Sequence, residues 1–410
     1  TDLGALREAT DAGSITLYCG FDPTAPSLHL GNLAQILTVR RFQQHGHRPL
    51  ALVGGATGLI GDPKESGERS LNPAETVQAW VDRIRGQLER FYDFDGPNAA
   101  VMVNNYDWTH DLSALEFLRD VGKHFSVNRM LDREAVAARL AKDGISYTEF
   151  SYQLLQSYDY LQLFRQYECV LQTGGSDQWG NITAGVDLVR RMDGAHVHAL
   201  TTPLITKADG TKFGKTESGT VWLDSELTSP YAFFQFWLNA DDRDVPVLLR
   251  TFSFRSQAEV DALIAATAER PHERTAQRAL AEELTQLVHG ADEMRGAAAA
   301  GQVLFGQGEL SDVPLDSLSA ALFETPNVTL EATEIEDGVL PAVDELMVRC
   351  GLVESKGAAR RAVKEGGAYL NNVRVVDPSQ RPTTDDLAQG RWLVLRRGKR
   401  TVGGVLVELT

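Results

Sequence analysis

The amino-acid sequence predicts an α/β protein: a Rossmann-like domain built on a parallel sheet, then an α-helical subdomain and a small α+β domain. Three observations support this fold class. Strand, helix and strand patterns follow one another over 15–22, 29–46 and 49–58, the order of a right-handed βαβ unit. Mainly helical sequence runs from 229 to about 302. From 341 onward, two short helices precede strands that include AYLNN and the hairpin-like RWLVLRRGKRTVGGVLVEL.

Length and cysteine usage limit the classes of protein to which the chain can belong. At 410 residues the chain is longer than a single hydrophobic core usually supports, so two or three domains are expected. Cys19, Cys169 and Cys350 show no CxxC spacing, which argues against a disulfide framework and a structural zinc site and favours a reducing compartment, the cytosol. No apolar run reaches the roughly 20 residues of a membrane span, and TDLGALREATD lacks the features of a signal peptide.

The charge of the chain is unevenly distributed. The net charge of −16 argues against nucleic-acid binding by the whole surface. Residues 341–410, however, contain 12 Lys and Arg and 8 Asp and Glu, a net charge of +4, whereas the preceding residues carry −20. Within this basic end, Lys356, Arg360 and Lys364 recur every four residues beside Arg361. Such a run is usually a solvated helix face, and it is also a candidate polyanion-binding surface.

The stretch YCGFDPTAPSLHLGN (18–32) passes from an apolar strand through a Pro-broken turn into a helix that begins at about His29. Backbone N–H groups and the helix dipole favour an anion at such a transition, and Gly31 allows close approach by a ligand. No GxxxxGK[ST] or GxGxxG motif follows the strand. His29 and Asn32 lie three residues apart on one helical face, so both side chains can reach the same oxygen cluster.

The middle of the chain completes the predicted α/β pattern. A helix is expected over 73–92, with Pro73 in its first turn, and AVMVN (100–104) reads as a buried strand. Residues 111–168 are largely helical. CVLQTGG (169–175) reads as a further strand, and GSDQWGN then opens a helix with Asp177 near its start.

Two segments of this region carry polar side chains that face either solvent or a ligand site. The helix 148–164 places Tyr152, Gln156 and Asp159 on one stripe of one face, which by pattern alone favours solvent over a pocket. KADGTKFGKTESG (207–219) has three lysines in nine positions and no apolar periodicity. Alone it would be a solvated turn; beside an anion-binding strand–helix turn it is predicted to be a lid over a polyphosphate.

These motifs together carry a resemblance to a known family. HLGN is similar to the His-Ile-Gly-His signature of class I aminoacyl-tRNA synthetases, and KFGKT to their Lys-Met-Ser-Lys-Ser loop. GGSDQWGNI (174–182) and YCGFDPTAPSLH narrow the resemblance to bacterial-type tyrosyl-tRNA synthetases, from about Thr16 to the end of the chain. The resemblance implies two steps, attack of tyrosine on the α-phosphate of ATP and then transfer of tyrosine to a terminal tRNA ribose hydroxyl. Positioned donors and cations, rather than a protein nucleophile, would catalyse both.

The resemblance also implies roles for particular residues. The implied catalytic groups at the phosphates are Thr24, His29, Asn32, Lys212, Lys215 and Thr216, with Lys207 a weaker member. The implied tyrosine site comprises Tyr18 and Asp159 at the phenol, Asp62, Tyr152 and Gln156 at the α-ammonium, and the supporting Asn105 and Gln172. The implied ATP site comprises Cys19, Gly20, Asp22, Thr24, His29, Gly31, Asn32, Gly175, Asp177, Gln178, Lys212 and Lys215.

The family pattern further implies partners and domains. The expected domains are a Rossmann-like catalytic domain (1–220) with a dimer-contact insertion at about 111–168, a helical domain (221–325), a linker (326–340) and an S4-like RNA-binding domain (341–410). VGKHFSVNRML, with Phe125 as an apolar anchor, would lie at the homodimer interface or pack within its own domain. The implied tRNA(Tyr)-binding residues are Lys356, Arg360, Arg361, Lys364, Arg396 and Arg397.

The sequence departs from the family pattern at two places. Asn32 replaces a second histidine, and its amide can donate where an imidazole N–H would. The loop after Asp62 is shorter and holds only Lys64 and Arg69 as basic residues. Mg²⁺ is expected to arrive with ATP, held by phosphates and water, without a dedicated protein metal site.

Two other functions remain as alternatives at this point. A tryptophan-specific synthetase would not need the phenol partners Tyr18 and Asp159. A catalytically inactive, synthetase-like RNA-binding protein would be expected to lose signature residues, whereas His29, Lys212 and Asp177 are all present.

Overall fold

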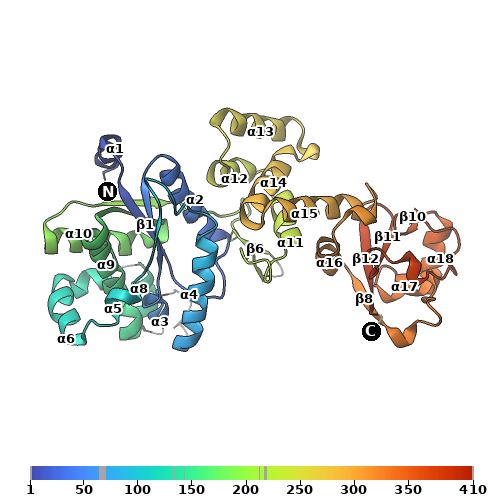
Figure 1. Ribbon diagram of the computed structural model, residues 1–410, viewed down its shortest axis with the longest axis horizontal. Helices are drawn as coiled ribbons and strands as arrows, with labels where there is room; N and C mark the ends of the chain where they lie inside the picture. The colour runs from blue at the N-terminus through green and yellow to red at the C-terminus, as the bar shows by residue number, and fades with distance from the viewer. Residues whose placement is uncertain are drawn as a thin grey trace. The chain divides into compact units, whose positions relative to one another are not determined.

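The structure is a computed structural model, and it describes residues 2–63, 71–132, 134–142, 144–211, 213–216 and 219–408. The chain divides into two compact units, Thr1–Asp224 and Ser225–Thr410 (Figure 1). Backbone hydrogen bonds from Leu30 to Val221 and from Leu223 to Leu28 hold the segment around 221–223 in the first unit. The first unit therefore extends a few residues beyond the boundary at 220 that the sequence predicts.

A five-stranded parallel sheet forms the centre of the first unit, which confirms the predicted α/β class. The strand order is β3-β2-β1-β4-β5. The strands are β1(Thr16–Phe21), β2(Arg48–Val53), β3(Val101–Asn104), β4(Cys169–Gly175) and β5(His198–Thr202). Chain order reverses between β1 and β4, which are paired in parallel. In open α/β sheets, the crevice at the carboxyl ends of two such strands is the usual place for a ligand.

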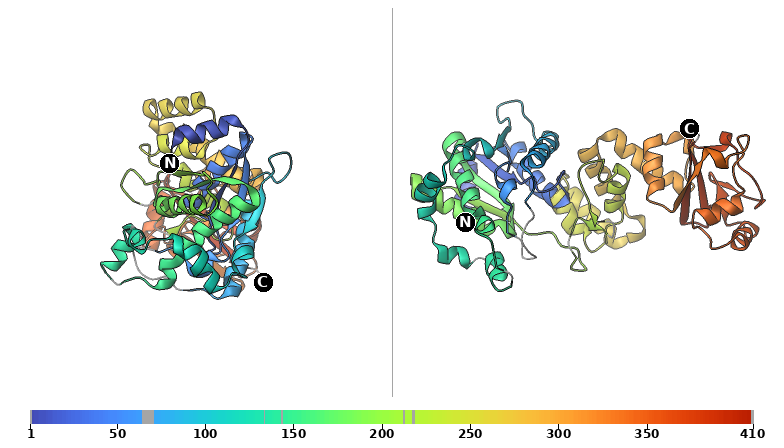
Figure 2. Two further views of the ribbon diagram at one scale, coloured as in Figure 1. Left: turned by 90° about the vertical axis from the view of Figure 1, so that its left-hand side faces the viewer. Right: turned by 90° about the horizontal axis from the view of Figure 1, so that it is seen from below.

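Helices cover both faces of this sheet. Figures 1 and 2 place α2(Leu30–Gln44) and α4(Ala74–Leu88) on one face and α9(Tyr147–Tyr167) and α10(Trp179–Asp193) on the other. Tyr160, Leu161 and Leu163 of α9 join Tyr18 and Leu50 of the sheet in one buried cluster. Burying each such side chain contributes about 1.5–3 kcal/mol. Tyr152 and Asp159, in the polar stripe of α9, are also buried, so this stripe does not face solvent as its pattern alone favoured.

The insertion between β3 and β4 is helical, as predicted, but the part of it that precedes α9 consists of short pieces. They are α5(Tyr106–Thr109), α6(Ala114–Glu116), the π-helical η1(Phe117–Val121), the 3₁₀ turn η2(Gly122–His124), α7(Val127–Leu131) and α8(Glu134–Leu140). A buried ion pair fastens α8 to α9, with Arg139 Nη1 3.0 Å from Glu149 Oε2 and both side chains at most 3% exposed. Arg139 Nε also donates to Gly144 O.

The remaining short elements of this unit are α1(Leu3–Ala12), α3(Thr57–Ile60), η3(Ser176–Gln178), β6(Lys215–Thr216) and β7(Gly219–Thr220).

The second unit begins with a group of helices. They are α11(Pro230–Leu238), α12(Val245–Phe252), α13(Gln257–Glu269), η4(Pro271–Glu273), α14(Thr275–His289), α15(Ala291–Leu304), η5(Leu310–Asp312) and α16(Leu315–Phe323). Within the part of the chain that the structure describes, no helix is long and apolar enough to cross a membrane.

A mixed five-stranded sheet, of order β10-β9-β11-β12-β8, ends the second unit. Its elements are β8(Asn327–Glu331), η6(Ala332–Glu334), α17(Val343–Arg349), α18(Lys356–Lys364), β9(Ala368–Leu370), β10(Val373–Arg374), η7(Thr384–Asp386), β11(Trp392–Arg397) and β12(Thr401–Glu408). The expectation that 326–340 is a linker is wrong in part, because β8 pairs in parallel with β12. Leu330 of β8 is fully buried in the core of this domain, and a strand that separates two domains would not be.

The two faces of this sheet are covered by different helices. Leu393, Leu395 and Val405 pack on one side with residues of α17 and α18. On the other side, α16 contacts the sheet: Trp392 Nε1 donates to Ser319 Oγ at 2.8 Å, and its ring meets Phe323 edge to face. Figure 1 shows α16 beside β12 and β8, opposite α17 and α18. The C-terminal domain is thus joined to the helical subdomain by specific contacts.

Candidate active site

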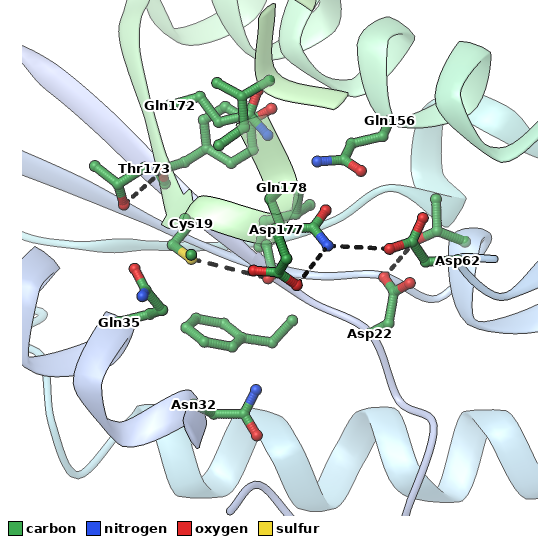
Figure 3. A pocket seen from close by; sticks show the side chains of 18 of the residues that line it. Cys19, Asp22, Asn32, Gln35, Asp62, Gln156, Gln172, Thr173, Asp177 and Gln178 are labelled. Carbon is green, nitrogen blue, oxygen red and sulfur yellow. Dashed lines mark hydrogen bonds between the residues drawn. The ribbon is translucent and has the colours of Figure 1, made fainter. Parts of the chain in front are cut away.

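A cavity of about 410 Å³ opens at the carboxyl ends of β1 and β4, the position that the strand order indicates. Figure 3 shows the labelled side chains that surround it. The predicted residues that line it are Tyr18, Cys19, Gly20, Asp22, Thr24, His29, Gly31, Asn32, Asp62, Tyr152, Gln156, Asp159, Gln172, Gly175, Asp177 and Gln178. Residues from 18 to 178 of the sequence therefore converge on one site.

The N-terminus of α2 faces this cavity and is closed by a reciprocal cap. His29 Nδ1 accepts from the backbone N–H of Gly31, and Asn32 Oδ1 accepts from the backbone N–H of His29, both at 3.0 Å. A Cβ on Gly31 would lie 2.8 Å from His29 Cε1. Glycine is therefore required here by the His29 ring, a different reason from the ligand approach inferred from sequence. Asn32 uses its oxygen for the cap, so its amide N–H₂ is the group that can serve a ligand.

The described part of the KFGKT loop runs beside this helix N-terminus. A Cβ on Gly214 would lie 3.2 Å from Leu30 Cβ and 3.9 Å from the nitrogen of Gly31. Gly214 O accepts from Val221 N at 2.9 Å. The loop backbone is thus next to the N-terminal end of α2, as the lid hypothesis requires. Lys212 lies outside the described residues. Lys215 and Thr216 form β6, and their side chains are not described.

Asp159 forms the buried end of the cavity. Its carboxylate accepts from Asn105 Nδ2 at 3.0 Å and from Trp108 Nε1 at 2.9 Å. Burial raises the pKa of Asp159 to about 7, against the opposite effect of these two hydrogen bonds. The hydroxyl of Tyr18, whose side chain is 1% exposed, has no hydrogen-bond partner within the described residues. The site therefore presents a carboxylate and a buried phenol to any ligand that reaches its floor.

The next part of the cavity carries acidic and amide groups. Gln178 Nε2 donates to Asp62 Oδ2 at 3.0 Å (Figure 3), and Asn181 Nδ2 donates to Gln178 Oε1 at 2.9 Å. Tyr152 OH donates to Asp22 Oδ2 at 2.7 Å. Gln156 Oε1 is buried without a partner among the described residues. Two carboxylates and an amide oxygen are a good match for an ammonium group.

The mouth of the cavity near β4 is formed by an exposed carboxylate and a buried thiol. Asp177 is exposed there, and a Cβ on Gly175 would lie 2.5 Å from its Oδ1, so glycine leaves room for this carboxylate. Cys19 lies beside it, and burial raises the pKa of its thiol to about 12, which makes the thiol a weak donor and a poor nucleophile. Gln172 is buried behind these groups, and its Oε1 has no partner in the described chain.

The structure adds residues that the sequence reasoning missed. Thr57, Gln35, Phe21, Leu52, Thr173, Gly174, Ile182 and Leu204 also line the cavity. Asn105 was predicted, but it lies behind the lining residues and acts through Thr57 and Asp159. Trp108 was not predicted. Neither Thr57 nor Trp108 had a pattern signal, because each reaches the site from a short helix that follows a strand end.

The predicted RNA-binding residues are all in the C-terminal domain, but they are not equivalent. Lys356 Nζ pairs with Glu345 at 2.9 Å, and Arg360 Nε pairs with Asp344 at 3.0 Å. Arg397 Nη1 donates to Leu352 O. The guanidinium of Arg396 is half-buried over the Tyr369 ring, 4.0 Å from the ring centroid.

Arg361 and Lys364 differ from these four. Both are exposed at the C-terminal end of α18, and neither forms an ion pair with a described residue. The uniform basic helix face that the sequence spacing predicts is therefore reduced to its C-terminal half.

Comparison with known proteins agrees with the fold. Residues 10–306 match the model of the class I tRNA synthetases (W and Y), and residues 320–402 match the tyrosine–tRNA ligase SYY-like C-terminal domain. The tyrosine–tRNA ligases of Streptomyces avermitilis and Streptomyces coelicolor are 62% and 61% identical, each over 99% of this chain and 95% of the relative. A C-terminally truncated mitochondrial tyrosyl-tRNA synthetase of Coccidioides posadasii is 32% identical with a TM-score of 0.63, over 73% of this chain and 86% of that one.

The parallel sheet, the cavity at its reversal point and the capped HLGN helix define a class I aminoacyl-tRNA synthetase fold. The family model alone leaves two members of that class open, since it covers both W and Y enzymes. The near full-length identity decides between them: the chain belongs to the tyrosine–tRNA ligase family.

Proposed function

We propose that this cavity binds L-tyrosine and ATP, forms tyrosyl-adenylate with release of pyrophosphate, and passes tyrosine to the 3′ end of tRNA(Tyr). The enzyme is a tyrosine–tRNA ligase (EC 6.1.1.1), and the observation that carries this conclusion is the identity of 62% over nearly the whole chain. The tryptophan-specific alternative is not favoured by relatives of this similarity. The assignment of each side chain to a part of the substrates rests on the geometry and on the family resemblance.

The buried end of the cavity is the proposed site of the phenol. Asp159 accepts two hydrogen bonds from the protein, and each of its oxygens keeps a lone pair for a further donor. The Tyr18 hydroxyl, which has no partner among the described residues, supplies a second contact. A phenolic O–H can serve both groups, whereas phenylalanine would leave the Tyr18 hydroxyl without a partner and Asp159 without this additional donor. Tyrosyl-tRNA synthetases are themselves the standard example of this kind of selectivity, with discrimination of about 10⁵-fold against phenylalanine.

The α-ammonium of tyrosine is proposed to lie among Asp62, Tyr152 and Gln156. Asp62 is held by Gln178, so its carboxylate is oriented before the ligand arrives. Tyr152 donates its proton to Asp22, and its oxygen therefore remains an acceptor for an ammonium N–H. Such preorganisation reduces the cost of binding. Gln172 and Asn105 support the pocket from behind.

The ATP is proposed to extend from β4 to the N-terminus of α2. Asp177, with Cys19 and Gly175 beside it, would accept the ribose hydroxyls, because an ionised carboxylate is acceptor-only. Thr24, His29 and Asn32 would contact the phosphates at the positive end of the α2 dipole. The other cavity residues assigned to ATP are Gly20, Asp22, Gly31 and Gln178.

The loop lysines are proposed to stabilise charge on the departing pyrophosphate. Lys212, Lys215 and Thr216 belong to the loop whose backbone at Gly214 lies beside Leu30. Mg²⁺ is proposed to enter with ATP, held by phosphate oxygens and water; the described residues contain no group of three or more His, Cys, Asp or Glu that could hold it alone. Lys64 and Arg69, candidates for a further phosphate contact, lie outside the described residues.

The C-terminal domain is the proposed tRNA-holding element. Its net charge of +4 contrasts with the acidic remainder of the chain. Arg361 and Lys364 are the proposed principal phosphate contacts, because Lys356 and Arg360 have acidic partners on α17. Arg396 and Arg397 are assigned secondary roles, since both are also used in contacts within the chain.

A homodimer is proposed through the insertion. Large apolar side chains are exposed on this segment, namely Leu115, Leu118, Val127, Leu131, Leu140 and Tyr147. Phe125, the anchor expected from sequence, instead packs against the buried cluster of its own unit. Val127 and Tyr147, at 58% and 68% exposure, are better candidates. The cytosol, where tRNA is charged for translation, is the proposed location.

Pyrophosphate exchange tests the proposal directly. ATP–pyrophosphate exchange should depend on tyrosine and should not be supported by tryptophan or phenylalanine at equal concentration. Charging of tRNA(Tyr) measured beside it tests the second step. Exchange with tryptophan, or charging without tyrosine-dependent exchange, would contradict the assignment.

A further inference from the structure

A continuous chain of hydrogen bonds links the two ends of the proposed tyrosine site. At one end, Tyr152 OH donates to Asp22 Oδ2 at 2.7 Å. The other oxygen of Asp22 accepts from Thr57 Oγ1, also at 2.7 Å. Thr57 begins α3, directly after β2, and is 2% exposed. A hydroxyl that no sequence pattern marks therefore lies at the centre of the site.

The chain of hydrogen bonds continues from Thr57 to the phenol end of the site. Asn105 Nδ2 donates to Thr57 Oγ1 at 2.8 Å and to Asp159 Oδ2 at 3.0 Å. Asn105 Oδ1 accepts from the backbone N–H of Ala56 at 2.7 Å, which sets the orientation of the amide. Asn105 is fully buried. Both of its N–H groups and its oxygen are thus used.

The direction of each hydrogen bond in this chain is determined by chemistry. Thr57 has a single hydroxyl hydrogen, and an ionised Asp22 can only accept it. The Thr57 oxygen must then accept from Asn105, which turns the second N–H of that amide to Asp159. The ordered pattern leaves both Asp159 and Tyr152 as acceptors toward the cavity.

The backbone next to Thr57 is shaped for this contact. A Cβ on Gly54 would lie 2.1 Å from Asp22 Oδ1 and 2.3 Å from Thr57 Oγ1, so any other residue would displace the hydrogen-bonded pair. The residues that meet here come from the ends of three neighbouring strands, β1, β2 and β3. The glycine after β2 is thus explained by the Asp22–Thr57 contact.

We infer that Thr57 is a positioning residue that couples the ammonium end of the tyrosine site to its phenol end. The inference rests on the proposed assignment of those two ends. Without the hydroxyl, Asp22 loses a donor and one N–H of Asn105 is left buried and unpaired, a costly state. Asn105 would then hold Asp159 less firmly, and Tyr152 would lose the fixed direction of its proton. Loss of the Thr57 hydroxyl would therefore loosen the site at both its ammonium end and its phenol end.

The first test compares Thr57→Val with Thr57→Ser. Valine keeps the β-branched shape and removes the hydroxyl, whereas serine keeps the hydroxyl and removes a methyl group. We expect Thr57→Val to raise the KM for tyrosine about tenfold and to lower the ratio of tyrosine to phenylalanine activation. Thr57→Ser should stay within about threefold of the wild type in both quantities. Equal effects of the two variants would show that Thr57 only fills space, and would overturn the inference.

The second test asks whether the two ends communicate. Tyr152 does not lie at the phenol, so Tyr152→Phe should change the tyrosine-to-phenylalanine ratio only through the chain of hydrogen bonds. We expect it to lower this ratio in the wild-type background and to leave it unchanged in the Thr57→Val background. A ratio unaffected by Tyr152→Phe in both backgrounds, or lowered equally in both, would overturn the coupling. Absence of tyrosine-dependent exchange in the wild type would instead reject the proposed function, so the two failures are distinguishable.

Discussion

Trp108 Nε1 lies 2.9 Å from Asp159 Oδ1, so an indole from the short helix α5 supports the carboxylate at the floor of the cavity. With Asn105 on the other oxygen, Asp159 is held in one orientation. Its side chain is nevertheless so buried that desolvation raises its pKa to about 7. The ionised form of Asp159 is therefore costly in the folded protein.

The first prediction concerns the stability cost of Asp159. Because the folded-state pKa is raised above the unfolded value of about 4, the folded protein binds a proton that the unfolded chain has released, and this group's contribution to stability falls as pH rises from about 4 to 7. Asp159→Asn should therefore become more stable relative to the wild type by about 1.4 kcal/mol for each pH unit in that window, and the difference should level off above it. Thermal midpoints of both proteins between about pH 5 and 8 measure this.

Asp193→Asn is a suitable control for that experiment. Its hydrogen bonds with Arg165 lower the pKa of Asp193, so this carboxylate is ionised in both states above about pH 5. The difference between Asp193→Asn and the wild type should stay constant across the same pH range. A constant difference for Asp159→Asn as well would contradict the raised pKa.

The second prediction concerns the phenol contacts. Tyr18→Phe removes the hydroxyl that faces the proposed substrate phenol and should lower the preference for tyrosine over phenylalanine in pyrophosphate exchange. Asp159→Ala should depress tyrosine activation far more severely. The matched control is Tyr160→Phe, a neighbouring buried tyrosine whose hydroxyl donates to His198 O and does not line the cavity. If Tyr18→Phe and Tyr160→Phe gave the same unchanged ratio, the phenol assignment would be wrong.

The third prediction concerns the KFGKT loop. Lys212→Ala or Lys215→Ala should lower the rate of adenylate formation by about 10² or more while tyrosine binding changes little, because the cations act mainly on charge that develops in the transition state. Single-turnover kinetics separate the two quantities. Lys142→Ala, an exposed lysine outside the cavity lining, is the control. Unchanged single-turnover rates for both loop variants would remove the lid hypothesis.

The fourth prediction concerns charge on α18. Reversal of Arg361 and Lys364 to Glu should weaken tRNA binding and reduce its salt dependence, while tyrosine-dependent exchange stays unchanged. These two are preferable to Arg360, because Arg360→Glu would place a second carboxylate against the buried Asp344 and disturb folding. Lys356→Gln serves as the comparison, with a smaller expected effect since Glu345 already pairs with that lysine. Equal effects at all positions would show that the ion pairs do not matter for RNA binding.

The fifth prediction concerns removal of the C-terminal domain. A chain that ends at Thr325 should keep tyrosine-dependent exchange near the full rate and lose most tRNA charging, because the phosphate contacts are removed. A cut near Glu336 is less suitable, since it would leave β8 without its partner β12. Full charging of tRNA by the shortened protein would show that another surface holds the RNA. Loss of exchange in a shortened protein that remains folded would place part of the activation chemistry beyond residue 325.

Features formed by residues that are close together in the sequence could be predicted from the sequence alone. The βαβ spacing, the HLGN and KFGKT motifs, the stripe of Tyr152, Gln156 and Asp159, and the basic C-terminal end all involve residues that are close in the chain. They were sufficient for the α/β class and the synthetase family. Propensity, periodicity and motif spacing act over a few residues, which is why these features can be recognised without a structure.

Which side chains meet could be learned only from the folded chain. Thr57 and Trp108 enter the site because parallel pairing brings the carboxyl ends of β1, β2 and β3 together, and no spacing in the sequence records that register. The same holds for Arg360, whose acidic partner Asp344 lies on another helix, and for β8, whose pairing partner β12 lies at the far end of the C-terminal domain. Hydrogen bonds and ion pairs depend on distances of about 3 Å in space, and these are set by sheet order and helix packing after the chain has folded.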